Sequence, residues 1–473
     1  MTRHILAIDQ GGHASRALLF DPAGRLVDTE AVPVATTRSA DGQRVEHDAE
    51  ALAASVQAAI AAVGTRAAAA GWTIAAAGLA TQRSSIACWH RGTGAAIAPV
   101  ISWQDRRNAA WLRRLEPRRD WIRTRTGLVL SPHYGASKLR WCLEELPAVR
   151  AAAEAGTLAM GPLASFLLAR LLAGGPCLAD PANASRTQLW DPARRDWDDE
   201  LLTLFGVPRN ALPACVDSRH DFGFLETPAG VVPLLVATGD QSAVPFAFGP
   251  LDPATAYVNA GTGAFVQRTL HGSVPAVPRL LASVVWSDAQ GADYLAEGTV
   301  NGAGSALDWL ANREGTTVEA LLQGMEADAG GAEPPLFLNG VGGLGSPFWV
   351  SDFDSRFVGA GTPATRALAV LESIVFLLRV NLDELRGLGP PFGRIVLTGG
   401  LAASATFCRR LADLGGLPVW RSTEAEATAR GLARLVAGPA AGWDAGPGDT
   451  LRPHPDPALA ARFERWRASM PAA

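Results

Sequence analysis

The first strands of the chain decide its fold class, because residues 4–20 read HILAIDQGGHASRALLF. Two short apolar runs, Ile5–Asp9 and Arg16–Phe20, are joined by a glycine turn, and a third run, Leu26–Val32, follows after another turn. Short apolar runs separated by turns of this kind are typical of neighbouring antiparallel strands. We therefore predict that the chain opens with three antiparallel strands.

A helix and a further strand are predicted next. The helix is expected from about Asp48, whose side chain can cap its first turn, to Ala70, and Gly71 should end it. The apolar run Ile74–Ala80 follows and predicts another buried strand. Three antiparallel strands, a helix and a strand are the element order of a ribonuclease H-like α/β domain.

The same order of elements is predicted again in the second half of the chain. Strands are expected at Ala254–Asn259 and Ala264–Thr269, then in further segments through residue 296, and finally at Arg394–Thr398. The helices of this half are expected at about residues 303–312 and 365–386. The repeated order indicates a second domain of similar design.

The length of the chain, 473 residues, also favours more than one domain. We predict an α/β fold with two ribonuclease H-like domains, residues 1–240 and residues 241–473, around a central cleft. The active site is expected in the cleft between the two similarly built halves.

The composition excludes several classes of protein. The net charge of −4 argues against nucleic-acid binding, which needs clustered Lys and Arg. Five scattered cysteines indicate neither a disulfide framework nor a zinc site. The N-terminus enters a strand without a charged and apolar leader, so we expect a cytoplasmic protein without a membrane segment. Lys138 is the only lysine in the chain, which indicates a role for a compact ammonium group.

Asp240 stands where a catalytic base is expected. The apolar run Val231–Ala237 predicts a buried strand, and Asp240 follows it after Gly239. Along the chain it lies between two glycine turns, Gly11-Gly12 and Gly261-Thr262-Gly263, whose backbone N–H groups can approach phosphate oxygens. An ordinary turn is the alternative interpretation of a single Gly-Asp pair. The set of three features favours phosphoryl transfer, with Asp240 taking the proton of the acceptor hydroxyl.

Further residues fit the needs of ATP. Asp9 ends the first strand and is suited to hold Mg²⁺, which prefers one or two carboxylates together with phosphate. Gly302–Gly304 opens a helix that carries Asp308, and a second glycine turn lies at residues 398–401. Both turns suit an adenine and ribose site, although helix capping would explain each of them equally well.

Many ordered motifs show a resemblance to a known family. The matching segments are Asp9-Gln10-Gly11 with Ser15-Arg16, Gln82-Arg83, Trp103 to Arg107, Lys138 to Trp141, Asn183 to Thr187, Gly239-Asp240-Gln241, Gly261-Thr262-Gly263, Gly343 to Trp349, Leu371 to Ile374 and Gly399-Gly400. Over roughly residues 3–437 the chain resembles the FGGY family of carbohydrate kinases, and within it the glycerol kinases most of all. The resemblance implies two actin-like ATPase domains that close on ATP and a sugar or polyol, with transfer to a terminal hydroxyl. It also implies that the first domain binds the sugar or polyol and part of the phosphates, and that the second binds the nucleotide.

The resemblance also implies roles for individual residues. It makes Asp240 the general base and Asp9 the acid beside the magnesium ion. The polyol site would contain Arg83, Trp103 and Gln241. The nucleotide contacts implied by the family positions are Gly11, Gly12, His13, Ser15, Gly261, Thr262, Gly304, Asp308, Gly400 and Ser404.

The chain departs from the glycerol kinases at two positions of the polyol site. Ser84 stands where the family has a Glu that holds a glycerol hydroxyl, and His133 stands where it has a Tyr, with Tyr134 next to it. The turn at Gly12 and His13 also differs from the usual pair of threonines. Loss of a charged acceptor should open the pocket and weaken the binding of a small triol. We therefore predict an acceptor larger than glycerol.

Four alternatives remain open on the sequence alone. The protein could phosphorylate glycerol itself, a longer polyol, or a ketose of four or five carbons. It could also be a catalytically impaired, nucleotide-dependent regulatory protein on the actin-like fold. The expected partner is a small molecule, and a homodimer is compatible with the sequence. ATP and Mg²⁺ are the predicted cofactors.

Overall fold

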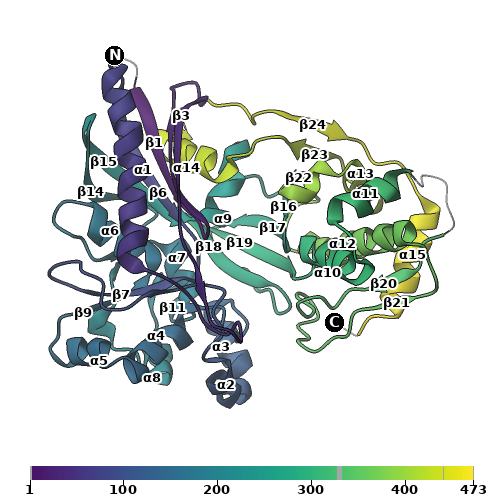
Figure 1. Cartoon of the computed structure of the whole chain (residues 1–473), viewed down its shortest axis with the longest axis horizontal. Coiled ribbons are helices and arrows are strands. Elements are labelled where there is room, and N and C mark those ends of the chain that lie inside the picture. The colour runs from purple at the N-terminus through teal and green to yellow at the C-terminus, as the bar shows by residue number, and fades with distance from the viewer. Residues whose placement is uncertain (1–2, 328–332, 440–441, 472–473) are drawn as a thin grey trace.

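Two large sheets, one from each half of the chain, organise the protein into two lobes (Figure 1). The computed structural model describes residues 3–327, 333–439 and 442–471. The first sheet has six strands in the order β14-β15-β6-β1-β2-β3. The second has seven, in the order β18-β19-β17-β16-β22-β23-β24. The two lobes therefore each contain one sheet of mixed strand direction.

The first sheet confirms the predicted strand order. Its strands are β1 (Arg3–Gln10), β2 (Ala14–Phe20), β3 (Leu26–Pro33), β6 (Thr73–Thr81), β14 (Arg219–Thr227) and β15 (Gly230–Gly239). Strands β1, β2 and β3 pair in antiparallel fashion, whereas β1 pairs in parallel with β6, and β6 with β15. The carboxyl ends of β1, β6 and β15 consequently meet at one edge of the sheet.

Helix α1 (Ala49–Ala69) covers one face of this sheet and follows the predicted bounds closely. Asp48 caps it by accepting a hydrogen bond from the Ala51 backbone N–H at 2.8 Å. Within the described part of the chain, α1 is the one helix that is long and apolar enough to cross a membrane by length and composition. Core helices meet the same criterion, and α1 packs against β2 and β3.

The second sheet repeats the design of the first. Its strands are β16 (Thr255–Ala260), β17 (Ala264–His271), β18 (Leu281–Asp288), β19 (Gly291–Val300), β22 (Arg394–Thr398), β23 (Val419–Ser422) and β24 (Gly448–Leu451). Strands β16, β17 and β19 are antiparallel neighbours, and β16 pairs in parallel with β22. Helices α10 (Gly304–Glu314) and α12 (Pro363–Arg386) lie where the sequence predicted helices, and both belong to the apolar core of this lobe.

A smaller layer is inserted in the first half, and the sequence analysis did not predict it. It contains a five-stranded sheet in the order β4-β5-β8-β7-β9. The strands are β4 (Thr37–Arg38), β5 (Val45–His47), β7 (Ile86–His90), β8 (Val100–Ile101) and β9 (Leu158–Pro162). Most are too short to show the alternation that reveals a strand in sequence. Helix α4 (Gly135–Glu145) packs on β7 and β9.

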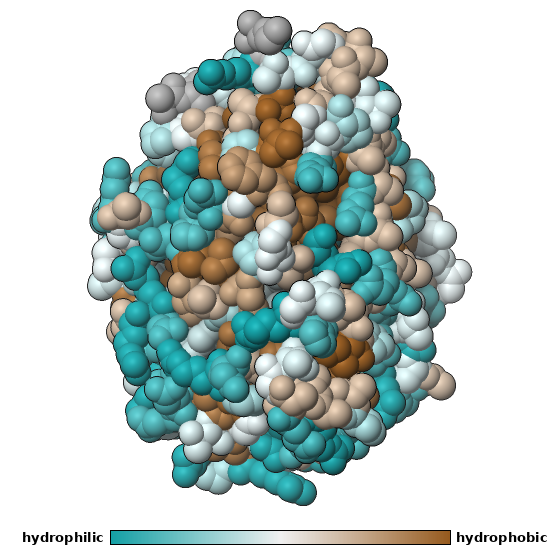
Figure 2. All heavy atoms as spheres, turned by 90° about the vertical axis from the view of Figure 1, so that its left-hand side faces the viewer, coloured by the Kyte–Doolittle hydropathy of each residue, from teal (hydrophilic) through white to brown (hydrophobic). Residues whose placement is uncertain are grey.

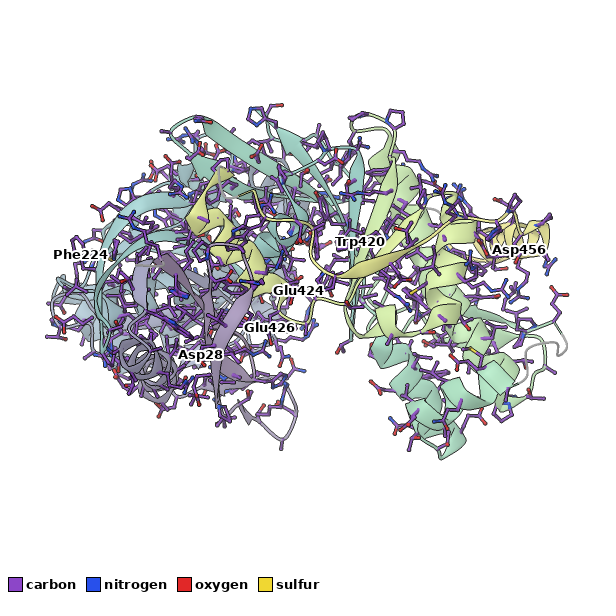
Figure 3. The ribbon with its side chains drawn as sticks, turned by 90° about the horizontal axis from the view of Figure 1, so that it is seen from above. Asp28, Phe224, Trp420, Glu424, Glu426 and Asp456 are labelled. Carbon is purple, nitrogen blue, oxygen red and sulfur yellow. The ribbon has the colours of Figure 1, made fainter. Side chains whose placement is uncertain are left out.

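The chain returns to the first lobe near its end. A connection at residues 423–426 carries Glu424 and Glu426 between the lobes (Figure 3). Helix α14 (Ala427–Ala437) then packs against β1, β6 and β15 of the first sheet and against the short helix α9 (Asp240–Ala243). One sequence segment of the second half is thus part of the first lobe. The division of the chain at residue 240 stays a prediction.

The face of the first lobe that points away from the second lobe carries apolar side chains among polar ones (Figure 2). At the edge of the sheet Phe224 of β14 is 50% exposed and Val231 of β15 is 66% exposed. Single exposed hydrophobic residues of this kind are normal on soluble domains. The predicted homodimer therefore gains no specific support here.

A glycine fixes how closely α14 approaches α9. A Cβ atom at Gly431 would lie 2.0 Å from the Ala243 carbonyl oxygen, whereas one at Gly324 of α11 (Val318–Ala327) would meet open space. Gly431→Ala should therefore lower the free energy of unfolding by about 1–3 kcal/mol through overpacking. Gly324→Ala should raise it by about 0.5–1 kcal/mol, since alanine favours a helix interior. Urea unfolding measures both variants. A Gly431→Ala protein as stable as wild type would contradict close docking of α14.

Candidate functional site

A cavity of about 240 Å³ opens at the edge of the first sheet where β1, β6 and β15 end. Its lining includes seven of the residues that the sequence predicted for the site: Gly12, His13, Arg83, Trp103, His133, Asp240 and Gln241. The parallel strands explain why Gly12, Arg83 and Asp240 meet with their neighbours in the chain, because residues that follow such strands emerge on the same side. Trp103 and His133 come from the inserted layer, after β8 and before α4. The structure therefore brings together the predicted base, part of the phosphate turn and the polyol residues.

Asp240 lines this cavity, and its charge acts on a second carboxylate, Asp9, which is not among the lining residues. Asp240 begins α9 directly after β15, and burial raises its pKa, while the positive charge of Arg83 opposes the rise. Arg83 Nε lies 3.9 Å from Asp240 Oδ1. The pKa of Asp9 rises to about 7, mainly through burial and next through the charge of Asp240. Asp9 and Asp240 are therefore close enough to serve one reaction centre.

Arg16 balances the charge of Asp9. Its Nη1 lies 3.8 Å from Asp9 Oδ2 and 3.1 Å from Glu426 Oε2. Glu426 comes from the connection between the lobes that Figure 3 shows. Arg16 consequently links the end of β1, through Asp9, to the start of α14.

The single carboxylate of Asp9 suits a magnesium ion whose other ligands include phosphate oxygens. In the residues that the structure describes, no three His, Cys, Asp or Glu side chains form a metal cluster. An ion at Asp9 would thus depend on phosphate oxygens and water for its other ligands, which is the usual coordination of Mg²⁺ in nucleotide enzymes. The raised pKa of Asp9 agrees with a carboxylate that lacks sufficient positive charge around it.

A buried carboxylate from the second sheet completes the charge network. Glu297 of β19 is fully buried, and its oxygens lie 3.4 Å from Arg83 Nη2 and 3.4 Å from Arg186 Nη2. Gln267 Nε2 donates to it at 2.7 Å. Burial alone would raise the pKa of Glu297, but the charges of Arg186 and Arg83 outweigh it and the pKa falls. Glu297 therefore remains ionised and ties the two lobes together.

The sequence analysis did not identify Glu297 or assign a role to Arg186. A signal for Glu297 was present, because a carboxylate interrupts the apolar strand segment at residues 294–300. A charged residue in a buried strand needs a partner of opposite charge. The partner itself is distant in sequence, so its identity was not visible.

Lys138 holds the two positions at which the chain departs from the glycerol kinases. It is buried in α4, and its Nζ donates to the carbonyl oxygens of Ser84 at 3.0 Å and His133 at 2.6 Å. Burial lowers its pKa to about 7. A compact ammonium can reach both carbonyls, whereas the planar fork of arginine is larger and differently shaped. This contact gives a physical reason for the single lysine of the chain.

His133 lines the cavity, whereas Ser84 lies next to the lining residue Arg83 in the chain. Ser84 has a φ of 66°, in the left-handed region, and its buried hydroxyl has no hydrogen-bond partner. Burial and the charge of Lys138 lower the pKa of His133 well below its usual range, so its ring is neutral. The ring packs against Trp103 with a centroid distance of 5.6 Å. The wall thus presents a neutral aromatic surface instead of a carboxylate.

The predicted glycine turns lie at the ends of strands. Gly11 and Gly12 connect β1 to β2, and Gly261 and Thr262 connect β16 to β17. Gly304 begins α10 and donates its N–H to the Gly261 carbonyl at 2.8 Å. A Cβ at Gly304 would lie 2.8 Å from that oxygen, so glycine permits the close approach. Gly400 is exposed in the turn after β22.

Two of the predicted nucleotide residues have structural partners instead. Ser15 is fully buried, and its hydroxyl lies 2.8 Å from that of Ser55 on α1, so it faces the core and not the cavity. The prediction for Ser15 overlooked that alternate residues of a strand point to opposite faces. Ser404 caps α13 (Ala405–Gly415) by accepting a hydrogen bond from the Phe407 N–H. Asp308 is exposed on α10.

The network around Glu297 yields a stability prediction. Glu297→Gln should lower the free energy of unfolding by about 3–5 kcal/mol, because two buried guanidinium groups would lose their counter-charge. The matched control is Glu384→Gln, whose partner Arg279 lies at 2.8 Å with a side chain that is 47% exposed. That change should cost less than about 1 kcal/mol. Equal losses in urea unfolding would show that Glu297 is not an essential counter-charge.

Comparison with known proteins places the chain in a family. Residues 4–258 match the N-terminal domain of the FGGY family of carbohydrate kinases, and residues 256–438 match its C-terminal domain. Glycerol kinase of Methylobacterium nodulans is 37% identical over 450 residues, which cover 92% of this chain and 89% of that protein. Glycerol kinase of Xanthobacter autotrophicus is 35% identical, covering 92% of this chain and 90% of that protein.

Solved structures show the same fold. Plasmodium falciparum glycerol kinase with ADP has a TM-score of 0.88 at 21% identity, covering 99% of this chain and 97% of that one. A xylulose kinase from Rhodospirillum rubrum has a TM-score of 0.85 at 21% identity, covering 99% and 97%. The prediction of two ribonuclease H-like domains is confirmed. With both family domains matched in order along almost the whole chain, the protein belongs to the FGGY family of carbohydrate kinases.

Proposed function

We propose that this carbohydrate kinase transfers a phosphoryl group from ATP to a terminal hydroxyl of a polyol or open-chain sugar larger than glycerol. The observation that carries the proposal is the cavity that Asp240 and His133 line, with Ser84 next to the lining residue Arg83 in the chain. The resemblance to glycerol kinases implies a glycerol-selecting Glu and Tyr at the positions of Ser84 and His133. The family supplies the reaction class. The residues of the cavity wall supply the argument about the acceptor.

Asp240 is the proposed general base. It borders the cavity at a strand end, and its raised pKa makes it a stronger proton acceptor than an ordinary aspartate. In the proposed reaction the acceptor hydroxyl loses its proton to Asp240 as its oxygen bonds to the terminal phosphorus of ATP and ADP leaves. Arg83, 3.9 Å from Asp240, keeps the carboxylate available in its ionised form.

Asp9 is the proposed residue for Mg²⁺, which neutralises phosphate charge when it is bound. The first phosphate turn, Gly11 to His13, lies next to it in the chain. His13 is exposed and borders the cavity, so it could donate to a phosphate oxygen where the family has threonine. This supports a role for the altered turn in binding.

The second lobe is proposed to bind the nucleotide. Thr262, Asp308 and Gly400 are exposed, and they lie after β16, in α10 and after β22. Strands β16 and β22 are parallel neighbours, so the two turns that follow them emerge at one edge of the second sheet. Gly261 and Gly304 contact each other at the same edge. Ser404 caps α13, the helix that follows the second of these turns.

The size of the cavity supports an acceptor longer than glycerol. At about 30 Å³ for each water of the liquid, its volume of about 240 Å³ corresponds to roughly eight waters. Trp103 and His133 offer apolar ring surface to the carbon chain, while Arg83 and Gln241 offer hydrogen bonds to hydroxyl groups. A longer acceptor can use this combination more fully than a triol.

Glycerol is the second candidate acceptor. It is favoured by the names of the relatives, since those at 35–37% identity are glycerol kinases. An impaired regulatory protein is not favoured, because Asp9 and Asp240 are both present and Asp240 lines the cavity. A cytoplasmic location, a homodimer and the lack of membrane or nucleic-acid partners stay predictions from composition.

Asp240→Asn should lower kcat by about 10²–10⁴, because the amide cannot accept the hydroxyl proton. Binding of ATP, measured by calorimetry, should stay close to wild type. Asp120→Asn is the matched control, since that side chain is 89% exposed. Turnover of the Asp240→Asn protein at the wild-type rate with saturating substrates would remove Asp240 from the mechanism.

The double variant Ser84→Glu with His133→Tyr should shift preference toward glycerol by about 1–3 kcal/mol, the value of one or two hydrogen bonds to a charged group. The measurement is kcat/KM for glycerol divided by kcat/KM for the best four- or five-carbon acceptor, in a coupled assay of ADP release. The wild type should prefer the longer acceptor. A wild type that favours glycerol over every longer polyol and ketose would refute the proposed size preference.

A further inference from the structure

His47 borders the cavity from a different layer of the first lobe than Asp240 does. It ends β5 of the inserted five-stranded sheet, whereas Asp240 follows β15 of the six-stranded sheet. Its side chain is 2% exposed overall, and the cavity is bounded by both residues. A ligand that contacts both must therefore extend from one sheet to the other.

The hydrogen bonds of His47 fix its tautomer. Nδ1 lies 3.0 Å from the Ala35 carbonyl oxygen. A carbonyl can only accept, so Nδ1 carries the proton and Nε2 carries a free lone pair. Nε2 is buried and has no hydrogen-bond partner within the protein. The ring thus presents an unsatisfied acceptor.

The surroundings keep this ring neutral. Burial is the main cause that lowers the pKa of His47, and the charges of His13 and Arg38 lower it further. The Ala35 bond raises the pKa, but it does not reverse the fall. A neutral imidazole with Nδ1 protonated can accept through Nε2, which a protonated ring could not do.

Unsatisfied donors complement this acceptor. Arg83 Nη1 and Arg186 Nη1 are buried without a hydrogen-bond partner, and both side chains border the cavity. Buried polar groups without partners are costly, so a ligand that satisfies them gains affinity and selectivity. A hydroxyl group both donates and accepts, whereas a carboxylate can only accept. The cavity therefore matches a neutral chain of several hydroxyl groups.

We propose that His47 determines acceptor specificity, with Nε2 accepting a hydrogen bond from a hydroxyl of the acceptor that lies away from the hydroxyl at Asp240. The identity of the reacting hydroxyl rests on the proposed function. The binding role of His47 does not rest on the proposed function, since it follows from the unpartnered Nε2 of a residue that lines the cavity. A polyol of four or more carbons has such a distal hydroxyl in addition to those that glycerol offers.

The test compares His47→Asn with His47→Gln. Asparagine can keep an N–H near the position of Nδ1 for the Ala35 carbonyl, but it has no atom at Nε2. Glutamine reaches the position of Nε2 and loses the Ala35 bond. The ratio of kcat/KM for a four- or five-carbon polyol to that for glycerol should fall about tenfold in His47→Asn and recover in part in His47→Gln. His271→Asn, at a side chain 79% exposed, should keep the wild-type ratio.

Calorimetry without nucleotide gives a second measurement that needs no turnover. The longer polyol should bind His47→Asn about tenfold more weakly than wild type, and the ratio to glycerol should fall in parallel. Equal losses for glycerol and the longer polyol would overturn the proposal and leave His47 as a support for the Ala35 segment. Equal binding by wild type and His47→Asn would overturn it as well.

The two proposals can fail separately. If wild type binds the longer polyol in a His47-dependent manner but no acceptor supports ADP release, the proposed kinase function fails and the role of His47 stands. If ADP release is rapid but its acceptor preference is the same in wild type and His47→Asn, the role of His47 fails and the kinase function stands.

Discussion

The parallel pairing of β1, β6 and β15 is the constraint on which the site depends. Parallel strands end at one edge of a sheet, so the residues that follow them meet there although they are far apart in sequence. Arg83 and Asp240 reach the cavity by this route, and Asp9, near the end of β1, lies close enough to interact with the charge of Asp240. The backbone hydrogen bonds of the sheet thus fix the separation of the two carboxylates, and the raised pKa of each follows from that burial.

The second constraint is electrostatic and joins the lobes. Glu297 is buried between Arg83 and Arg186, and taking such charges out of water is costly unless they are paired. The same contacts position two guanidinium groups at the wall of the cavity. The carboxylate of Glu297, which connects the lobes, therefore also orients the two arginines at the wall of the proposed acceptor site. Arg16 acts similarly on the other side, between Asp9 and Glu426.

The acceptor site combines retained and altered features. The proposed base and the arginine beside it are present, while Ser84 and the neutral ring of His133 stand where the resemblance to glycerol kinases implies a Glu and a Tyr. Lys138 donates hydrogen bonds to the backbone carbonyls of Ser84 and His133, so the backbone at these two positions is held independently of their side chains. Specificity can thus differ within one architecture, since it depends on the hydrogen-bond partners that the wall offers.

The sequence by itself determined the opening strands of both large sheets, helices α1, α10 and α12, the cap at Asp48, and the strand-end positions of Asp9 and Asp240, but not the inserted five-stranded layer. These features depend on neighbours in the chain, through the spacing of apolar residues and the geometry of glycine turns. Its ordered motifs also identified the family. Only the tertiary structure decided that Ser15 faces the core, that α14 returns to the first sheet, and that His47 borders the cavity. Arg83 and Glu297 are 214 positions apart, and their contact exists because two sheets pack together, which no local pattern encodes.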